Sequence, residues 1–540
     1  MINAGEFDYI VVGSGSSGCV VAGRLSEGGR RTVLLLEAGP NDSHPLIKMV
    51  GGFTKLLSAP SSRVWLALSE PEAALGQRVI EQIRGKTLGG SGSVNGMCYI
   101  RGNPLDYDDW AKAGCIGWGW SDVLPYFRKL EDFYGGASEY RGVGGPVKVS
   151  SRHQRGGVAD DFIKAAQAAG YPLNPDFNGP AQDGVGFNQN NTDGHSRSTS
   201  TTYLRRPVAG HGLRIETSAC ATRIQLDGRR AVGVHYVQNG RAFMARARAE
   251  IIVSAGAINS PQLLQLSGIG PGSLLSALGL KVEVDSSAVG EHLQDHFGVR
   301  MQFRYRKPVT LNELGRSPVK QIWEALKYYA GLESLLNFTG VPAGVFARTD
   351  SSRDRPNIQI NLLNWSVAPG ANGFPKPHPF PGFTFDVMHL RPESEGSVTI
   401  ASPDPKASPA IRYNFLSTEG DIKGILGGVK IGRAIARQPP LREMVVEELD
   451  PSARIQADDE LISYIRETGT SDYHPAGTCR MGSDPAVSVV DPRLRVHGVE
   501  GLRVADCSIM PAVSTGNTGV PALMIGEKAA DLILADAKGR

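Results

Sequence analysis

FDYIVVGSGSSG, residues 7–18, decides the fold class of this chain. Its first half is an apolar, β-rich run, its second half has the form GxGxxG, and residues 19–25 can continue as a helix. Residues 32–36, TVLLL, form a second apolar run, as expected for a parallel strand that helices cover on both faces. We therefore predict a βαβ unit that opens a doubly wound, Rossmann-like α/β domain.

The glycine pattern predicts a dinucleotide site. Gly13, Gly15 and Gly18 allow the backbone to approach a pyrophosphate, and the following helix N-terminus offers amide donors. Glu37 stands at the end of the second apolar run, where a carboxylate can accept hydrogen bonds from the ribose hydroxyls and would repel a 2′-phosphate. The motif by itself does not separate FAD from NAD.

A second glycine-rich stretch, RGKTLGGSGSVNG, covers residues 84–96. Basic residues bracket its start, and the apolar run MCYI follows it. We expect this stretch to pass through the protein against a planar or phosphorylated ligand, because a flexible surface loop would not continue into an apolar segment.

The later parts of the chain predict further sheets. Asp227-Gly228 and Asn239-Gly240 mark tight hairpins in a β-meander over 222–252. Ser260 is expected to cap a helix that starts with Pro261. Additional strands are expected at 299–305, 357–363, 383–390 and 397–400, which would form an antiparallel sheet, and at 502–508, with a closing helix over 521–535.

Composition narrows the class of protein. The 540 residues are 41% hydrophobic and 21% charged, with a formal net charge of +3, so we expect no nucleic-acid partner. The six cysteines form no CxxC pair, no spacing suggests a metal site, and neither a signal peptide nor a membrane-spanning run is evident. We expect a cytoplasmic protein. His292 and His296, four residues apart, are expected to cover a helix face or to pack near a domain interface.

Five ordered blocks resemble the glucose-methanol-choline (GMC) oxidoreductase family, in particular its choline dehydrogenase-like members. The second glycine-rich stretch, with Tyr99, Gly102 and Asp108, resembles the first family signature, and GAINSPQLLQLSGIG (256–270) resembles the second. The supporting blocks are GEHLQDH (290–296), HPAGTC (474–479) and NTGVP (517–521). The resemblance runs from Phe7 to about Asp536.

The resemblance implies an FAD-binding domain built from discontinuous pieces, 1–150, 200–297 and 475–540. Residues 151–199 and 298–474 would form a substrate-binding domain with an antiparallel sheet over the flavin. The implied cofactor-binding residues are Gly13, Gly15, Ser16, Ser17, Gly18, Glu37, Ala38, Trp65, Leu88, Gly90, Asn95, Gly96, Met97, Cys98, Ala221, Asp506 and Thr518. Trp65 and Ala221 would lie near the adenine, and the Gly96 amide near the flavin N5.

Two departures from the family pattern bear on the flavin. Gly92 replaces the commoner second serine of the GGSS run, and Val94 stands where some choline oxidases carry a flavin-linking histidine. We therefore expect FAD to be held non-covalently.

The implied catalytic residues are His474 and Asn517. An alcohol releases a hydride readily only as its hydroxyl proton leaves, so a base near pKa 7 is required, and imidazole fits. His474 would take the proton, Asn517 would stabilise the developing alkoxide, and flavin N5 would accept the hydride. The predicted function is FAD-dependent oxidation of a primary or polyhydric alcohol to the aldehyde.

Three points stay open. A hydroxynitrile lyase-like enzyme of the same fold is an alternative, as is an alcohol oxidase that uses O2. We expect the electron acceptor to be a quinone or dye, because Asp472 and Tyr473 could crowd or hydrate an oxygen pocket beside His474; they could equally point into the substrate domain. Asn364-Trp365 and residues 369–383 should line the substrate pocket, but their sequence does not identify the alcohol that binds there.

Overall fold

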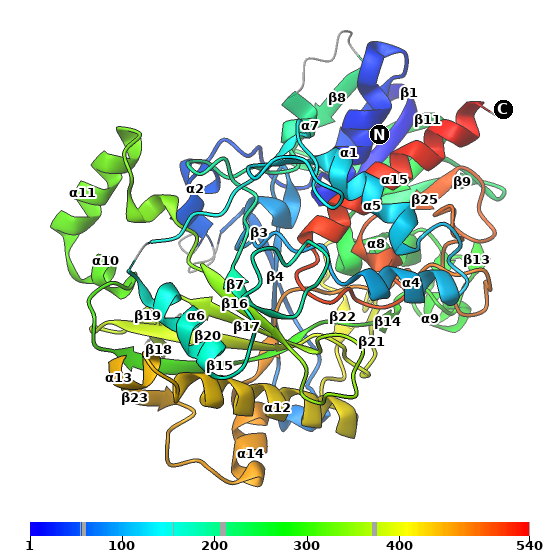
Figure 1. Cartoon of the computed structure of the whole chain (residues 1–540). Coiled ribbons are helices and arrows are strands. Elements are labelled where there is room, and N and C mark those ends of the chain that lie inside the picture. The colour runs from blue at the N-terminus through cyan, green and yellow to red at the C-terminus, as the bar shows by residue number, and fades with distance from the viewer. Residues whose placement is uncertain (54–55, 57–60, 155, 206–211, 370–374, 539–540) are drawn as a thin grey trace.

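Two large sheets organise the chain in the computed structural model (Figure 1). The structure describes residues 1–540 except 54–55, 57–60, 155, 206–211, 370–374 and 539–540. The expected pocket run 369–383 thus lies partly outside the described residues. Among the described helices, none is long and apolar enough to cross a membrane.

The first sheet has the predicted α/β character. Its strand order is β8-β2-β1-β11-β10-β9, and β25 pairs with β11. Strands β1 (Ile2–Val12), β2 (Val33–Leu36), β8 (Leu213–Glu216), β11 (Arg241–Val253) and β25 (Leu502–Val504) run parallel to one another. β9 (Ala219–Asp227) and β10 (Arg230–Gln238) complete the predicted meander with antiparallel pairing. Helix α1 (Ser16–Ser26) packs beside the last helix, α15 (Gly519–Lys538), so the two ends of the chain build one domain.

Two glycines of the GxGxxG run are required by close backbone approach. Gly13 has φ +95°, and a side-chain carbon there would lie 2.5 Å from the carbonyl oxygen of Ser254, at the end of β11. A side-chain carbon at Gly18 would meet the carbonyl oxygen of Gly13 at 1.9 Å. These contacts let α1 start directly against the ends of β1 and β11, which is the packing expected of the motif.

The expected cap at Ser260 is wrong. Helix α8 (Gly256–Leu266) begins four residues earlier and includes Pro261 in its interior. A proline there leaves the carbonyl of Ala257 without its helical partner. The hydroxyl of Thr478 donates to that carbonyl across 2.6 Å, which compensates for the missing bond and allows the helix to continue through the proline.

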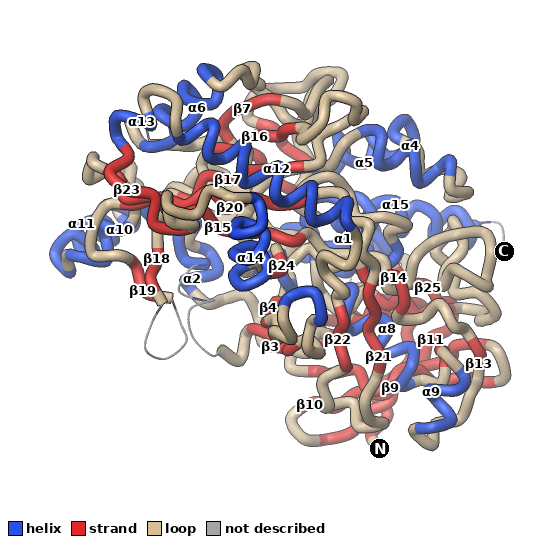
Figure 2. Tube along the Cα trace, turned by 90° about the horizontal axis from the view of Figure 1, so that it is seen from below, coloured by secondary structure: helices blue, strands red, loops and turns tan. Residues whose placement is uncertain are grey.

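The second sheet has one apolar and one polar face. Its order is β23-β15-β20-β17-β16-β7, and β24 (Thr470–Ser471) pairs with β15. The strands are β7 (Gly184–Phe187), β15 (Phe297–Tyr305), β16 (Ala343–Ala347), β17 (Ile358–Leu363), β20 (Gly382–His389) and β23 (Val445–Asp450). Residues such as Met301, Phe385 and Ile360 form a core under helices α6 (Val158–Ala168) and α12 (Glu419–Ala436) (Figure 2). Gln359, Asn361 and Asp386 alternate with these residues and therefore face the opposite way.

Two expected strands differ from the structure. The segment expected at 397–400 is β21 (Gly396–Thr399), which does not join the large antiparallel sheet but pairs with β14 (Glu291–Leu293) and β22 (Ala410–Arg412). The closing strand ends at Val504, because the next residues turn into a 3-10 segment, Cys507–Ile509, that begins with a cap from Asp506. The two sheets belong to separate hydrophobic cores, and we propose the discontinuous domain boundaries given above on that basis.

Candidate active site

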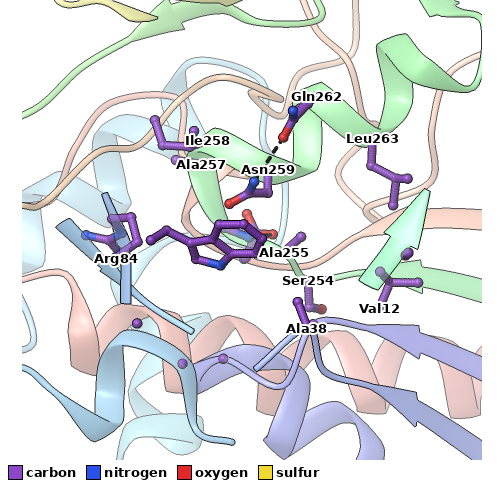
Figure 3. Close-up of a pocket in the computed structure, with 18 of the residues that line it drawn as sticks. Val12, Ala38, Arg84, Ser254, Ala255, Ala257, Ile258, Asn259, Gln262 and Leu263 are labelled. Carbon is purple, nitrogen blue, oxygen red and sulfur yellow. Dashed lines mark hydrogen bonds between the residues drawn. The ribbon is translucent and has the colours of Figure 1, made fainter. Parts of the chain in front are cut away.

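A cavity runs along the carboxyl ends of the first sheet (Figure 3). Val12, Ala38 and Ser254 lie at one side of it, and Ala257 and Gln262 of α8 at the other. Such a position, at the ends of parallel strands and beside a helix N-terminus, is where doubly wound sheets bind nucleotides.

Ten of the seventeen expected cofactor residues line this cavity: Gly13, Gly15, Ser16, Ser17, Glu37, Ala38, Trp65, Gly90, Ala221 and Asp506. Gly18 packs α1 against the sheet instead. Leu88, Asn95, Gly96, Met97, Cys98 and Thr518 are not part of the cavity wall. Asp506 contributes wall surface, but its carboxylate already accepts hydrogen bonds from the Ser260 hydroxyl (2.6 Å) and the Gly256 amide (2.9 Å) at the start of α8.

The two glycine-rich stretches touch each other. A side-chain carbon at Gly90, which has φ +54°, would lie 2.7 Å from Cα of Gly15. Glu37 lies beneath them and is buried, and its carboxylate accepts from the Ser14 amide (3.1 Å), the Ser14 hydroxyl (2.6 Å) and the Gly39 amide (2.8 Å). Burial raises the pKa of Glu37. Its carboxylate thus organises the first glycine loop as well as facing the cavity.

The expected flavin segment adjoins the segment that carries Asn517. Gly519 lies next to Asn95, since a side-chain carbon at Gly519 would be 3.5 Å from the amide nitrogen of Asn95. Arg197 donates to Oδ1 of Asn95 across 2.8 Å. Nε and Nη2 of Arg197 are buried without a hydrogen-bond partner among the described residues, and burial lowers its pKa to about 9. Sequence reasoning missed Arg197, because an isolated arginine in a polar loop carries no motif.

His474 and Asn517 meet, although they are 43 residues apart. The side-chain nitrogen Nδ2 of Asn517 lies 3.0 Å from Nε2 of His474. An amide nitrogen can only donate, so Nε2 accepts, and the proton of the neutral ring is on Nδ1. Nδ1 in turn lies 3.0 Å from Nδ1 of His296. The lone pair of Nε2 therefore points to the side of Asn517.

The backbone around His474 is held from two sides. The His474 amide donates to Oδ1 of Asp295 (2.7 Å), and the Ser471 hydroxyl donates to Oδ2 of the same carboxylate (2.6 Å). Arg84 donates to the carbonyl oxygen of Tyr473 (2.6 Å). Burial raises the pKa of Asp295 to about 6. Asp295 and Arg84 thus fix the loop through its main chain.

Of the two alternatives expected for His292 and His296, the helix face is wrong. Both His292 and His296 lie outside helices: His292 is in β14 (Glu291–Leu293), which pairs with β21, and His296 lies just before β15. His296 is fully buried against His474, whereas His292 pairs with Glu395 (2.7 Å). Burial lowers the pKa of His296 to about 3, and burial together with His296 and Arg84 lowers the pKa of His474 well below 6.5. Both rings are therefore neutral at neutral pH.

The polar face of the second sheet continues the site. Nε2 of Gln359 lies 3.4 Å from Oδ1 of Asn517 and 3.2 Å from Oδ1 of Asn361. Asp472, which precedes His474, leans on the second sheet, since a side-chain carbon at Gly298 would be 2.2 Å from its Oδ2. Burial, followed by repulsion from Asp386, raises the pKa of Asp472 well above its usual range. Gln359 and Asn361 carry no local sequence signal, because only strand pairing brings them here.

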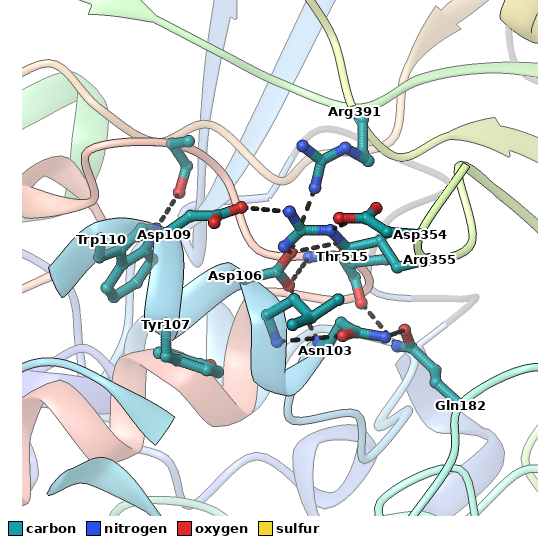
Figure 4. Close-up of polar contacts among 12 residues, drawn as sticks. Asn103, Asp106, Tyr107, Asp109, Trp110, Gln182, Asp354, Arg355, Arg391 and Thr515 are labelled. Carbon is teal, nitrogen blue, oxygen red and sulfur yellow. Dashed lines mark hydrogen bonds and ion pairs between the residues drawn. The ribbon is translucent and has the colours of Figure 1, made fainter. Parts of the chain in front are cut away.

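A buried ion-pair cluster holds the segment before Asn517 (Figure 4). The carboxylate of Asp106, on α4 (Pro104–Lys112), accepts from the Thr515 amide (2.6 Å) and the Thr515 hydroxyl (2.7 Å). Arg355 pairs with the same carboxylate at 3.1 Å, and with Asp109 one turn further along α4. Gln182 donates to the carbonyl oxygen of Thr515 (2.8 Å). The position of Asn517, two residues later, thus depends on groups from both halves of the chain.

Family models described as GMC oxidoreductase match residues 7–298 and 392–526, which is more than half of the chain. This chain is a GMC oxidoreductase. Curated proteins named oxygen-dependent choline dehydrogenase are similar to it over nearly the whole length. The Rhizobium johnstonii and Brucella suis proteins are each 39% identical to it, with 98% of this chain and 96% of the relative covered.

Solved structures agree with the family assignment. The GMC oxidoreductase superposes on formate oxidase from Aspergillus oryzae with a TM-score of 0.93 at 27% identity and full coverage of both chains. Pyridoxine 4-oxidase from Mesorbium loti gives a TM-score of 0.87 at 30% identity, with 97% and 98% of the two chains covered. The GMC oxidoreductase is accordingly an FAD-dependent enzyme that acts on CH–OH groups, as the sequence predicted.

The residues of the cavity fit FAD. The GMC oxidoreductase offers the α1 N-terminus and two touching glycine loops to a pyrophosphate, and at Gly15 a side-chain carbon would meet only the Ser254 carbonyl oxygen, at 3.9 Å. Pro475, adjacent to His474, lines the same cavity, so the cavity extends to the residue next to His474. The buried, unpartnered nitrogens of Arg197 are donors that a bound cofactor could use.

Proposed function

We propose that this enzyme oxidises a primary or polyhydric alcohol to the aldehyde, with His474 as the base. The observation that supports this most is the pairing of His474 Nε2 with Asn517 Nδ2 at 3.0 Å beside the polar face of the second sheet. When bound, FAD supplies the acceptor for the hydride of the alcohol carbon, at flavin N5.

The side chains act on the alcohol hydroxyl. His474 is neutral with Nε2 unprotonated, so an alcohol hydroxyl that takes the place of the Asn517 N–H at Nε2 can give its proton to this nitrogen. The two N–H donors of the Asn517 amide are then available to the developing alkoxide beside Nε2. Asp295, His296 and Arg84 are positioning residues for this pair.

We further propose that FAD is held non-covalently. Val94 is buried and packs against Ile47 and Leu56, so its position offers an apolar contact and no nucleophile. The cavity residues, including Gly90 and Glu37, would hold the cofactor by hydrogen bonds and packing, together with Asn95 and its neighbours outside the cavity wall. Acid precipitation should leave intact FAD in the supernatant, and flavin that stays with the precipitated protein would refute this proposal. FAD modification is described for the similar formate oxidase from Aspergillus oryzae, so the mass of the released flavin should be measured as well.

The substrate class follows from the relatives only as a proposal. The curated relatives are named for choline, and similar structures are named for pyridoxine and for aryl alcohols, all of which carry a primary alcohol. Trp365 packs edge-on against Phe53 with ring centroids 6.4 Å apart, and Phe53 forms a small apolar cluster with Val50 and Met97, which gives the expected pocket an apolar wall. A panel of these alcohols, mixed with the enzyme without oxygen, should bleach the flavin absorbance for at least one member. A cyanohydrin that is cleaved without bleaching would support the lyase alternative instead.

The acceptor is proposed to be a quinone or dye, with O2 as the alternative. The carboxylate of Asp472 packs against Gly298 of the second sheet. Crowding by Asp472 beside His474 is therefore a weak argument against O2 as the electron acceptor. The names of the curated relatives favour oxygen as one acceptor. Mixing the substrate-reduced enzyme with air and then with a quinone decides between them.

The six cysteines, all unpaired, support the expected cytoplasmic location.

A further inference from the structure

Helix α11 (Pro318–Tyr329) exposes its apolar face. Val319, Ile322, Trp323, Leu326 and Tyr329 are 77%, 63%, 60%, 58% and 71% exposed. Their spacing of three or four residues places them on one stripe of the helix. Together with α10 (Asn312–Arg316), α11 extends from the edge of the molecule in both views (Figures 1 and 2).

The polar side of α11 faces the protein, which inverts the usual arrangement of a surface helix. Glu324 is buried and accepts from the Ser334 hydroxyl (3.0 Å) and the Leu335 amide (2.7 Å). Tyr328 is buried and stacks on His195 with ring centroids 4.3 Å apart. These contacts fix the rotation of the helix, so the apolar stripe is held outward by the fold.

The acidic side chains of α10 and α11 are turned toward the protein, and the basic side chains around the stripe are more exposed. Glu313 and Glu324 are turned inward, with side chains 15% and 6% exposed, whereas their partners Arg316 and Lys327 are 49% and 26% exposed. Lys376 is also exposed and lies on β19 (Lys376–Pro377), which is next to α10 because Pro377 contacts Gly315. The exposed acids near the helix are Glu333, which follows it, and Asp193, whose charge acts on Tyr328. The outward surface is therefore apolar at its centre and mainly basic at its edge.

This pattern fits a lipid surface better than a protein partner. Trp and Tyr beside aliphatic residues, with Lys and Arg at the border, are typical of helices that lie in the interfacial layer of a bilayer. A second copy of the chain is the alternative occupant of this face, and vesicle flotation distinguishes the two.

We propose that α11 docks the enzyme on the surface of an anionic lipid bilayer, with Ile322, Trp323 and Leu326 inserted among the lipids. Helix α11 is connected to the active site through the 3-10 segment Leu335–Asn337, which packs on Val50–Gly52, next to Met97 of the expected flavin segment. Docking here would bring the catalytic half of the molecule close to lipid-dissolved acceptors or alcohols.

The test uses the purified holoenzyme and vesicle flotation. Vesicles of phosphatidylcholine, with and without phosphatidylglycerol, are floated with the wild type, with the double variant Ile322→Glu/Leu326→Glu, and with a matched control, Ile116→Glu/Val487→Glu. The control changes two residues that are 82% and 49% exposed elsewhere on the surface. We expect the wild type and the control to float with the anionic vesicles. The double variant should lose at least tenfold in partition coefficient while its flavin content and its reduction by alcohol stay unchanged.

A second readout does not depend on the folding of the double variant. The fluorescence difference between the wild type and Trp323→Phe should shift to shorter wavelength when anionic vesicles are added. Equal flotation of the wild type and the double variant would overturn the proposal. A wild type that does not float with vesicles and whose Trp323 emission does not shift would overturn it as well. If the wild type is a dimer, the double variant is a monomer and neither binds vesicles, the proposal is also overturned. The face would then be assigned to a second copy of the chain.

Discussion

The side-chain amide of Asn517 donates a hydrogen bond to Nε2 of His474 across 3.0 Å. This bond fixes the tautomer of His474 and places one further amide N–H of Asn517 beside the basic nitrogen. The two groups that an alcohol oxidation needs, a proton acceptor and a donor to the alkoxide, are thus preassembled on loops from different parts of the chain.

Replacing Asn517 should slow the chemistry and spare the cofactor. Asn517→Ala removes one donor to the developing alkoxide, and the loss of such a donor typically costs about 10²-fold in rate. Stopped-flow measurement of flavin reduction under anaerobic conditions should show this loss at saturating alcohol, with the FAD content unchanged. A rate constant within twofold of the wild type would rule out the role given to Asn517.

The acid limb of flavin reduction should lie below the pKa of free imidazole. Burial, His296 and Arg84 all lower the pKa of His474, so the base remains neutral as the pH falls through about 6.5, where a free histidine would become protonated. The rate constant of flavin reduction at saturating alcohol should therefore stay level down to that pH and fall only below it. An acid limb at or above pH 6.5 would contradict a neutral, buried His474.

Asp106 should act on catalysis through the segment before Asn517. Asp106→Asn replaces an acceptor of the Thr515 bonds with a donor, which should displace Asn517 and lower the flavin-reduction rate about tenfold or more. Asp109→Asn is the matched control, because Asp109 lies on the same helix and pairs with Arg355 without contacting Thr515. The Asp106 effect should appear in the rate constant of reduction rather than in FAD content. Equal effects of the two variants would show only a general loss of the ion-pair cluster.

Asp295 should make stability fall as the pH rises from about 4 to 6. Its pKa is about 6 in the folded protein, against about 3.9 for an unfolded aspartate, so the folded state binds the proton more tightly and unfolding releases it in this window. The free energy of unfolding of the wild type should lose roughly 3 kcal/mol relative to Asp295→Asn across that window. Urea unfolding of both proteins at pH 4, 5 and 6 measures this. A difference between them that does not change with pH would contradict the raised pKa.

Local patterns in the sequence were sufficient to predict the βαβ unit of the first sheet. GxGxxG after a strand, with Glu37 at the end of the next, predicted the βαβ unit because every contact involved is between near neighbours in sequence or within one sheet. The same reasoning failed at Ser260, where a distant hydroxyl, that of Thr478, supports a proline inside α8.

The surroundings of His474 and Asn517 depend on contacts that no local pattern encodes. His474 and Asn517 could be chosen by resemblance, but His296, Gln359 and Asp106 reach them only through strand pairing and an ion-pair cluster across the two halves of the chain. The spacing of His292 and His296 suggested a helix, yet the segment contains β14, which pairs with β21, and His292 contacts Glu395 while His296 contacts His474. Exposure of the apolar face of α11 was likewise not predictable, since the helical spacing alone is that of an ordinary packed helix.

Single-turnover reduction of the bound flavin tests the central claim most directly. The wild type and His474→Ala, each loaded with FAD, are mixed anaerobically with a primary alcohol from the panel that bleaches the wild-type flavin. We predict that His474→Ala retains FAD and loses about 10²- to 10⁴-fold in the rate constant of bleaching, the usual contribution of a general base. Bleaching of the variant at the wild-type rate, or failure of every alcohol to bleach the wild-type enzyme, would contradict the role of His474 as the base of an alcohol oxidation.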